Sequence, residues 1–168
     1  MLAEGCQLVG QQPTKALSQA SQFIYTTFMK NPKELLPHRD PFLFVDRIET
    51  ATAEKIVGYR TFTDKEHFFA GHFPDYPVVP GVILVETMAQ IGGAGVNQQG
   101  LLGDKLFFLA TVEKAKFRRQ VRPNEEVRIE VTNERVRGAM IKQSGIAYVG
   151  DEVAAEAAWM CLVGDAPA

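Results

Sequence analysis

Residues 70–90, AGHFPDYPVVPGVILVETMAQ, contain two side chains suited to acid–base chemistry, His72 and Glu86. His72 lies in a loop with several prolines, which restrict the backbone and favour a fixed position for the histidine. Histidine titrates near neutral pH, so a neutral His72 could accept a proton. Glu86 interrupts an apolar run, where a charge is costly and the protonated carboxyl is favoured, so it could donate a proton. The pair predicts a site that removes one proton and supplies another.

The helix expected to begin near Gly81 supplies further groups for such a site. A helix start presents free backbone N–H groups and the positive end of the helix dipole, so we predict that Gly81 and Val82 bind a substrate oxygen that gains negative charge. Gln90 shares a helical face with Glu86 and could orient its carboxyl group, although an ordinary polar residue at a helix edge fits the same spacing. Phe73 is compatible with either the core or an apolar substrate tunnel.

The other histidines and the cysteines do not suggest a metal centre. His38, His67 and His72 match no usual zinc spacing, so we expect His38 to be structural or near the substrate and His67 to be a loop residue. Cys6 and Cys161 suggest neither a disulfide framework nor a metal cluster, which favours a reducing cytoplasm. We predict no metal ion and no organic cofactor.

The composition narrows the class of protein. A chain of 168 residues with 46% hydrophobic and 23% charged residues fits one ordinary globular domain. Its net charge of −2 argues against a dedicated nucleic-acid binder, which would be clearly basic. No segment approaches the roughly 18 apolar residues of a membrane span, and the first residues lack the pattern of a secretory signal. We therefore expect a soluble cytoplasmic protein.

The helices that the sequence predicts have different apolar patterns. Apolar residues recur every three or four positions over residues 14–30, which predicts an accessory helix within an N-terminal extension, residues 1–32. The helix from Gly81 is apolar around almost its whole circumference, which is typical of a buried helix. Residues 33–168 then form a single domain built on that helix.

The rest of this domain is rich in strand patterns. We predict strands at residues 42–48, 55–62, 106–112, 116–121, 125–136, 140–149 and 152–163. Their connections are too short for parallel crossovers. The fold class is therefore α+β, an antiparallel β-sheet wrapped around one long central hydrophobic helix.

The segment GHFPDYPVVPGVILVETMAQ resembles the signature of the dehydratases that act on (3R)-hydroxyacyl chains bound to acyl carrier protein in fatty acid synthesis, a family with the hot-dog fold. Upstream, LLPHRDPFLFVDRI is similar to the opening strand of the family, and downstream FLATVEKAKFRRQVRPNEEVRIEV is similar to the following strands. The resemblance covers residues 33–163, with three blocks in the expected order. Glutamate at position 86 matches the plain dehydratase branch, because the related dehydratase-isomerases typically carry aspartate there.

This resemblance implies a reaction and an assembly. The family converts the (3R)-hydroxyacyl thioester, carried on the phosphopantetheine of acyl carrier protein, to the trans-2-enoyl thioester. The resemblance implies that His72 and Glu86 are the catalytic residues. In the family the histidine of one subunit works with the glutamate of its partner. The resemblance thus implies a homodimer with composite active sites, and such dimers can assemble further into a trimer of dimers.

A basic cluster in the downstream block has two interpretations. It consists of Lys114, Lys116, Arg118, Arg119 and Arg122. The simpler interpretation is that these basic residues lie on the solvent-exposed face of a strand. The alternative is a docking surface for acyl carrier protein, which is acidic and would be attracted by complementary charge.

Two other functions fit a hot-dog domain. An acyl thioesterase would use a carboxylate and water to release free acid and thiol. A non-catalytic acyl-binding module of a larger synthase would bind the thioester without turnover, which the presence of both His72 and Glu86 argues against.

Overall fold

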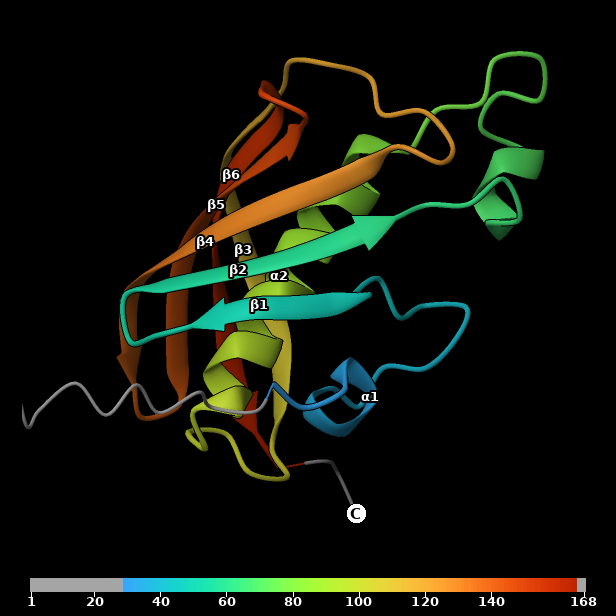
Figure 1. Ribbon diagram of the computed structural model, residues 1–168. Coiled ribbons are helices and arrows are strands. Elements are labelled where there is room, and N and C mark those ends of the chain that lie inside the picture. The colour runs from blue at the N-terminus through green and yellow to red at the C-terminus, as the bar shows by residue number, and fades with distance from the viewer. Residues whose placement is uncertain (1–28, 166–168) are drawn as a thin grey trace, which may run out of the picture.

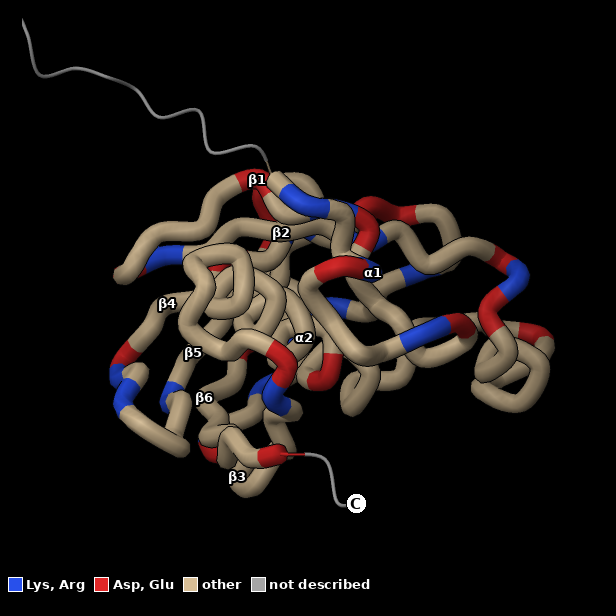
Figure 2. The backbone as a smooth tube through the Cα atoms, turned by 90° about the horizontal axis from the view of Figure 1, so that it is seen from below, with Lys and Arg blue, Asp and Glu red and all other residues tan. Residues whose placement is uncertain are grey.

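The computed structural model describes residues 29–165, which form a curved antiparallel sheet around a long helix, α2 (Gly81–Gln98) (Figure 1). Two short helices precede it, α1 (Pro32–Leu35) and the 3-10 helix η1 (His67–Ala70). The six strands are β1 (Arg47–Ala51), β2 (Lys55–Thr61), β3 (Leu106–Phe117), β4 (Glu126–Arg137), β5 (Met140–Val149) and β6 (Glu152–Gly164). Their order in the sheet is β1-β2-β4-β5-β6-β3, and α2 contacts every strand. Seen from below, the strands follow an arc around α2 (Figure 2). The predicted α+β hot-dog architecture is confirmed.

Helix α2 is the centre of the hydrophobic core. Met88, Ile91 and Ala94 are completely buried, as the apolar pattern around the whole helix predicts. Glycine on the same helix lets the sheet approach closely: a Cβ at Gly95 would lie 2.5 Å from side-chain atoms of Ile56 on β2. A larger residue at position 95 would therefore force the helix away from the sheet.

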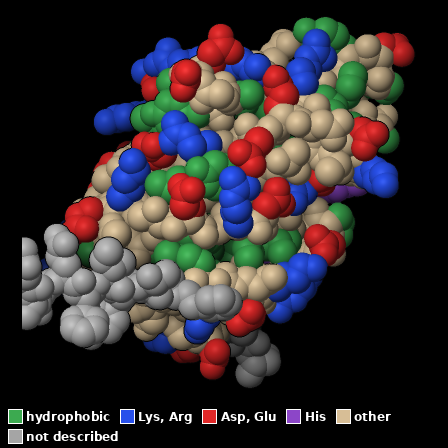
Figure 3. Space-filling model, viewed as in Figure 1, with side chains coloured by type: hydrophobic (Ala, Val, Ile, Leu, Met, Phe, Trp, Pro, Cys, Tyr) green, Lys and Arg blue, Asp and Glu red, His purple; other side chains and the backbone are tan. Residues whose placement is uncertain are grey.

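Strand β4 shows how the sequence separates the two faces of the sheet. Val127, Ile129 and Val131 are fully buried against the core, and the residues between them point outward. On the outer face Lys55 pairs with Glu130 at 3.0 Å. Figure 3 shows positive and negative side chains interspersed over the face that β1, β2 and β4 present in this view. Charged residues of both signs thus lie on the outside of this part of the sheet.

The strand predicted at residues 42–48 is wrong for most of its length, because β1 begins only at Arg47. Among the preceding residues, Phe42 and Phe44 bond to Gln90 of α2, whereas the Asp46 N–H already donates to the Tyr59 carbonyl of β2 at 2.9 Å. The Phe44 N–H donates to the Gln90 side chain at 2.8 Å, and Phe44 is completely buried. Apolar residues on both faces of this segment reflect contact with the core, not membership of the sheet.

The strands predicted at residues 106–112 and 116–121 are one strand, β3, which ends at Phe117. Its pairing with β6 shifts register between Glu113 and Lys116, and Lys114 has a positive φ of 53°. A bulge therefore absorbs the irregularity without ending the strand. Four strands follow α2, not five, and β6 pairs with both β5 and β3.

The accessory helix predicted at residues 14–30 lies outside the described residues except for its last two positions. Across the described range, the helices are too short or too polar to cross a membrane.

Candidate active site

His72 is held by the loop between η1 and α2. Its backbone N–H donates to the Phe68 carbonyl at 2.8 Å, and its Nδ1 lies 2.9 Å from the Val78 carbonyl oxygen. A carbonyl oxygen only accepts, so Nδ1 carries the proton of the neutral imidazole and Nε2 keeps its lone pair. The loop thus selects the tautomer in which Nε2 can act as a base.

A cavity of about 500 Å³ lies beside His72 at the start of α2. Its lining includes Gly81 and Val82, together with Phe117 at the end of β3. The ring of Phe117 lies against the helix start, where a Cβ on Gly81 would lie 2.7 Å from ring carbon Cε1. Glycine at this position therefore allows an aromatic wall to approach the first turn of α2.

The first turn of α2 has backbone donors available to a ligand. Pro80 provides no side-chain cap, and its carbonyl accepts from Ile83 at 2.9 Å and Leu84 at 3.3 Å. The N–H groups of Gly81 and Val82 precede these bonds and lie at the positive end of the helix dipole. The predicted substrate-binding positions therefore lie with His72 around one cavity.

Gln90 holds Glu86 from within the core. Gln90 is completely buried, and its Oε1 accepts from the Phe44 N–H, which fixes the orientation of the amide. The Nε2 group then donates to the Phe42 carbonyl and to Glu86 Oε1, both at 2.9 Å. The Glu86 side chain is 22% exposed, so it lies at the edge of the core. The alternative of an ordinary helix-edge residue does not fit Gln90.

The structure also places His38 beside Glu86, with Nε2 3.7 Å from Glu86 Oε1. The sequence left His38 open between a structural role and a place near the substrate. No local spacing connects it with Glu86, since the contact depends on how the segment before β1 packs against α2. Sequence reasoning therefore missed this neighbour of the carboxyl group.

His72 and Glu86 have different partners within one chain. Both are described, and neither a hydrogen bond nor an ion pair joins them. Phe73 packs its ring on His72, with centroids 4.4 Å apart, and is 57% exposed, so it is not a core residue. One copy of the chain thus presents the two predicted catalytic side chains in separate settings.

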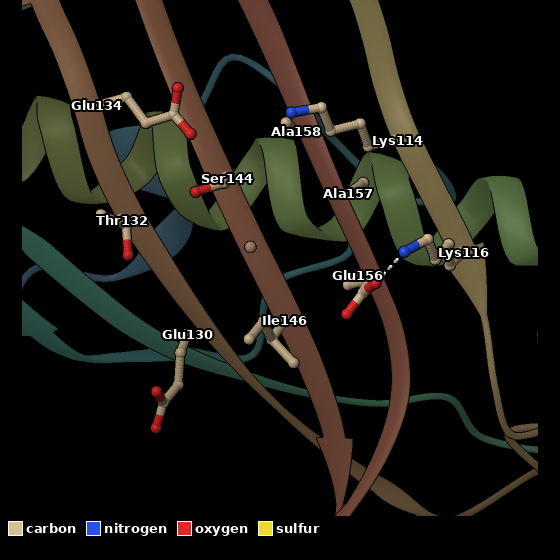
Figure 4. A pocket seen from close by; sticks show the side chains of 11 residues that line it. Lys114, Lys116, Glu130, Thr132, Glu134, Ser144, Ile146, Glu156, Ala157 and Ala158 are labelled. Atoms are coloured by element: carbon tan, nitrogen blue, oxygen red, sulfur yellow. Dashed lines mark ion pairs between the residues drawn. The ribbon is translucent and has the colours of Figure 1, made fainter.

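The basic cluster borders two hollows near the end of β3. Lys114 and Lys116 border a second hollow of about 340 Å³ on the face of the sheet opposite α2, where Lys116 pairs with Glu156 at 3.3 Å (Figure 4). Arg118 and Arg119 instead line the cavity beside His72. Lys116 and Arg118 nevertheless pair with the same oxygen of Glu156, so the lysines adjoin the arginines at the end of β3.

The arginines at the cavity also stabilise its wall. Arg119 bridges Glu125 and Glu152, both at 2.7 Å, and the hydrogen bonds from Arg119 lower the pKa of Glu125 to about 2. Arg122 lies 3.5 Å from the ring centroid of Tyr76 and donates to the Pro77 carbonyl at 3.1 Å. These contacts tie the end of β3 and the turn before β4 to the loop of His72.

Within residues 29–165, the His, Cys, Asp and Glu side chains do not gather in any group of three that could hold a metal ion.

Comparison with known families and proteins is consistent with this geometry. Residues 36–158 match the model of the FabA-like domain. The chain is 47% identical over 132 residues to the 3-hydroxyacyl-(acyl-carrier-protein) dehydratase FabZ of Pelotomaculum thermopropionicum, which covers 78% of this chain and 94% of that protein. It is 43% identical over 134 residues to the FabZ protein of Bacillus cereus, covering 79% of this chain and 93% of that protein.

Solved structures show the same fold at much lower sequence identity. The dehydratase heterocomplex ApeI:P from Xenorhabdus doucetiae matches with a TM-score of 0.69 and 14% identity, covering 81% of this chain and 92% of that one. A structure of a putative thioesterase from Ralstonia eutropha matches with a TM-score of 0.55 and 17% identity, covering 68% and 82%. Because a protein named as a dehydratase and one named as a thioesterase share this fold, the two matches show the fold alone.

Replacing Gln90 by leucine should affect both stability and any reaction that uses Glu86. The substitution leaves the buried Phe44 N–H without its acceptor, which should lower the free energy of unfolding by about 1–3 kcal/mol. It also frees the Glu86 carboxyl, so kcat should fall. Urea unfolding and steady-state kinetics measure the two effects. The matched variant Gln99→Leu, at the C-cap of α2, should retain kcat. Wild-type stability and kcat in Gln90→Leu would contradict the assigned role.

Proposed function

Because this chain belongs to the FabA-like family, we propose that it dehydrates (3R)-hydroxyacyl chains on acyl carrier protein to trans-2-enoyl chains, with His72 and Glu86 as its acid–base pair. It is a 3-hydroxyacyl-acyl-carrier-protein dehydratase of fatty acid biosynthesis. The cytoplasm remains the predicted location.

The hydrogen bond from His72 Nδ1 to the Val78 carbonyl is the observation that carries the assignment of the base. It leaves Nε2 unprotonated at a cavity that also contains the first turn of α2. In the proposed reaction Nε2 takes a proton from C2, while the Gly81 and Val82 N–H groups stabilise the negative charge on the thioester oxygen. Glu86 protonates the C3 hydroxyl, which leaves as water as the C2–C3 double bond forms.

We further propose that the site is completed by a second copy of the chain through strand β3. Within the described sheet β3 pairs only with β6, so its other edge is available for pairing. Phe108, Leu109, Val112 and Phe117 are 41–53% exposed on this strand. A long apolar edge of this kind is suited to pairing with another strand. Pairing would bury these side chains and join the histidine of one copy with the glutamate of the other. Assembly into a trimer of dimers remains a further prediction.

Acyl carrier protein is proposed to dock at the rim of the cavity through Arg118, with Arg119 and Arg122 nearby. Arg118 is half exposed and pairs with the carboxylate of Glu156 at 2.8 Å. Arg119 and Arg122 are engaged in the contacts that stabilise the wall, so Arg118 is the arginine most available to an acidic partner. Lys114 and Lys116 precede Arg118 along β3 and border the other hollow, so they are left out of this docking proposal.

Removing either member of the acid–base pair should abolish turnover without unfolding the protein. His72→Ala removes the proposed base, and Glu86→Gln removes the proposed acid while keeping its shape, so each kcat should fall by about 10²-fold or more. The loss of enoyl-thioester absorbance on hydration measures the reverse reaction, and circular dichroism checks the fold. Wild-type hydration by either folded variant would reject the assignment. Release of free thiol from acyl thioesters by the wild type would favour a thioesterase instead.

Charge reversal at Arg118 tests the docking surface. Arg118→Glu should raise the apparent KM for the carrier-bound substrate, because it opposes an acidic partner, and leave the KM for a pantetheine thioester unchanged. The difference should diminish at high salt, which screens exposed charges. Lys114→Glu makes the same charge change earlier along β3, at the other hollow, and should alter neither KM. Equal effects of Arg118→Glu on both substrates would argue against docking at this rim.

A further inference from the structure

His38 is a partly buried ionisable group next to Glu86 that the proposed reaction leaves without a role. Its ring lies near the rings of Phe42, at a centroid distance of 6.3 Å, and Phe107, at 5.9 Å. The side chain is 22% exposed, as is that of Glu86. Two aromatic neighbours from different parts of the chain therefore fix the imidazole in front of the carboxyl group.

The surroundings of the two ring nitrogens determine where His38 carries its proton. Nδ1 is buried and has no hydrogen-bond partner among the described residues, whereas Nε2 lies 3.7 Å from Glu86 Oε1. A proton on Nδ1 would have no acceptor, but a proton on Nε2 is directed at a carboxyl oxygen. Burial lowers the pKa of His38, an effect that Glu86 opposes and Arg39 adds to, so the neutral form dominates at neutral pH. His38 is therefore neutral, with its proton on Nε2.

The other groups around Glu86 leave the Oε2 atom available for the acidic proton. Gln90 Nε2 already donates to Oε1, so Oε1 faces two N–H groups, from Gln90 and from His38. Cys161, from β6, stays a neutral thiol because burial, with a smaller contribution from Glu86, raises its pKa to about 12. Arg39 directs its guanidinium to the carbonyls of Leu36 and His38. Among the described residues no lysine or arginine pairs with Glu86.

We propose that His38 is a positioning residue that acts through Glu86, an inference that rests on the proposed dehydration. With Gln90 it keeps Oε1 as an acceptor, so the acidic proton sits on Oε2 and faces the substrate. As the C3–O bond breaks, that proton moves from Oε2 to the leaving hydroxyl and forms water, and Glu86 becomes a carboxylate. The His38 Nε2–H stays in place and stabilises this new charge. The separation of 3.7 Å closes to a hydrogen bond as the charge develops, since catalytic contacts tighten in the reacting complex.

Three substitutions of His38 separate this role from a structural one. Glutamine places an N–H near the position of Nε2, asparagine places one near Nδ1, and leucine supplies none. His38→Leu and His38→Asn should lower kcat by about tenfold, less than the loss of a donor that touches the substrate, with KM changed by less than about twofold. His38→Gln should keep kcat within about threefold of the wild type. His67→Leu, a histidine substitution in η1 away from Glu86, should leave kcat unchanged.

Long-range ¹H–¹⁵N NMR of the histidine rings gives a readout that does not depend on turnover. The signal lost in His38→Gln should be that of an imidazole with a protonated Nε2 and an unprotonated Nδ1. A protonated Nδ1, an unchanged kcat in folded His38→Leu, or equal losses in His38→Gln and His38→Leu would each overturn the role of His38. An inactive wild type would instead reject the dehydratase assignment itself, so the two failures are distinguishable.

Discussion

The hydrogen bonds of the buried Gln90 amide connect the core of this protein to its chemistry. Its oxygen accepts from Phe44 and its nitrogen donates to the Phe42 carbonyl, so residues 42–44 bond to α2 instead of the sheet. The second N–H of the same nitrogen holds Glu86. Since an unpaired buried amide group is costly, the three partners constrain one another. The position of the proposed acid is thus determined by the same contacts that attach this segment to the core.

The base is positioned independently, by the loop before α2. His72 bonds to the Val78 carbonyl, and the next residue, Val79, donates to the Val121 carbonyl beyond the end of β3. Arg119 and Arg122 strengthen the same region through their carboxylate, carbonyl and ring contacts. The wall of the cavity is therefore continuous with β3, the strand whose exposed edge we propose as the dimer interface. A cavity placed at that edge explains how two chains could contribute to one site.

Local patterns in the sequence were sufficient to predict α2, its burial and the antiparallel sheet, because α2 is a long apolar run and strands such as β4 alternate apolar with polar residues. They failed where tertiary contacts override the pattern. Residues 42–45 look like a strand because both faces are apolar, yet a glutamine far along the chain takes their hydrogen bonds. The bulge in β3 has no distinctive residue, since Lys114 adopts its positive φ without glycine. His72 and Glu86 could be selected from residue type and spacing, whereas the contact between His38 and Glu86 depends on packing that no spacing encodes.

Mixing two inactive variants tests most directly whether His72 and Glu86 of different copies form the site. Purified His72→Ala and Glu86→Gln are denatured together, refolded and assayed for enoyl-thioester hydration. In a mixed dimer one site combines the intact His72 of one chain with the intact Glu86 of the other, so random mixing should restore about a quarter of wild-type activity. The same variants refolded separately should remain inactive. No recovery in a mixture that contains mixed dimers, identified by a size tag on one variant, would contradict the composite site.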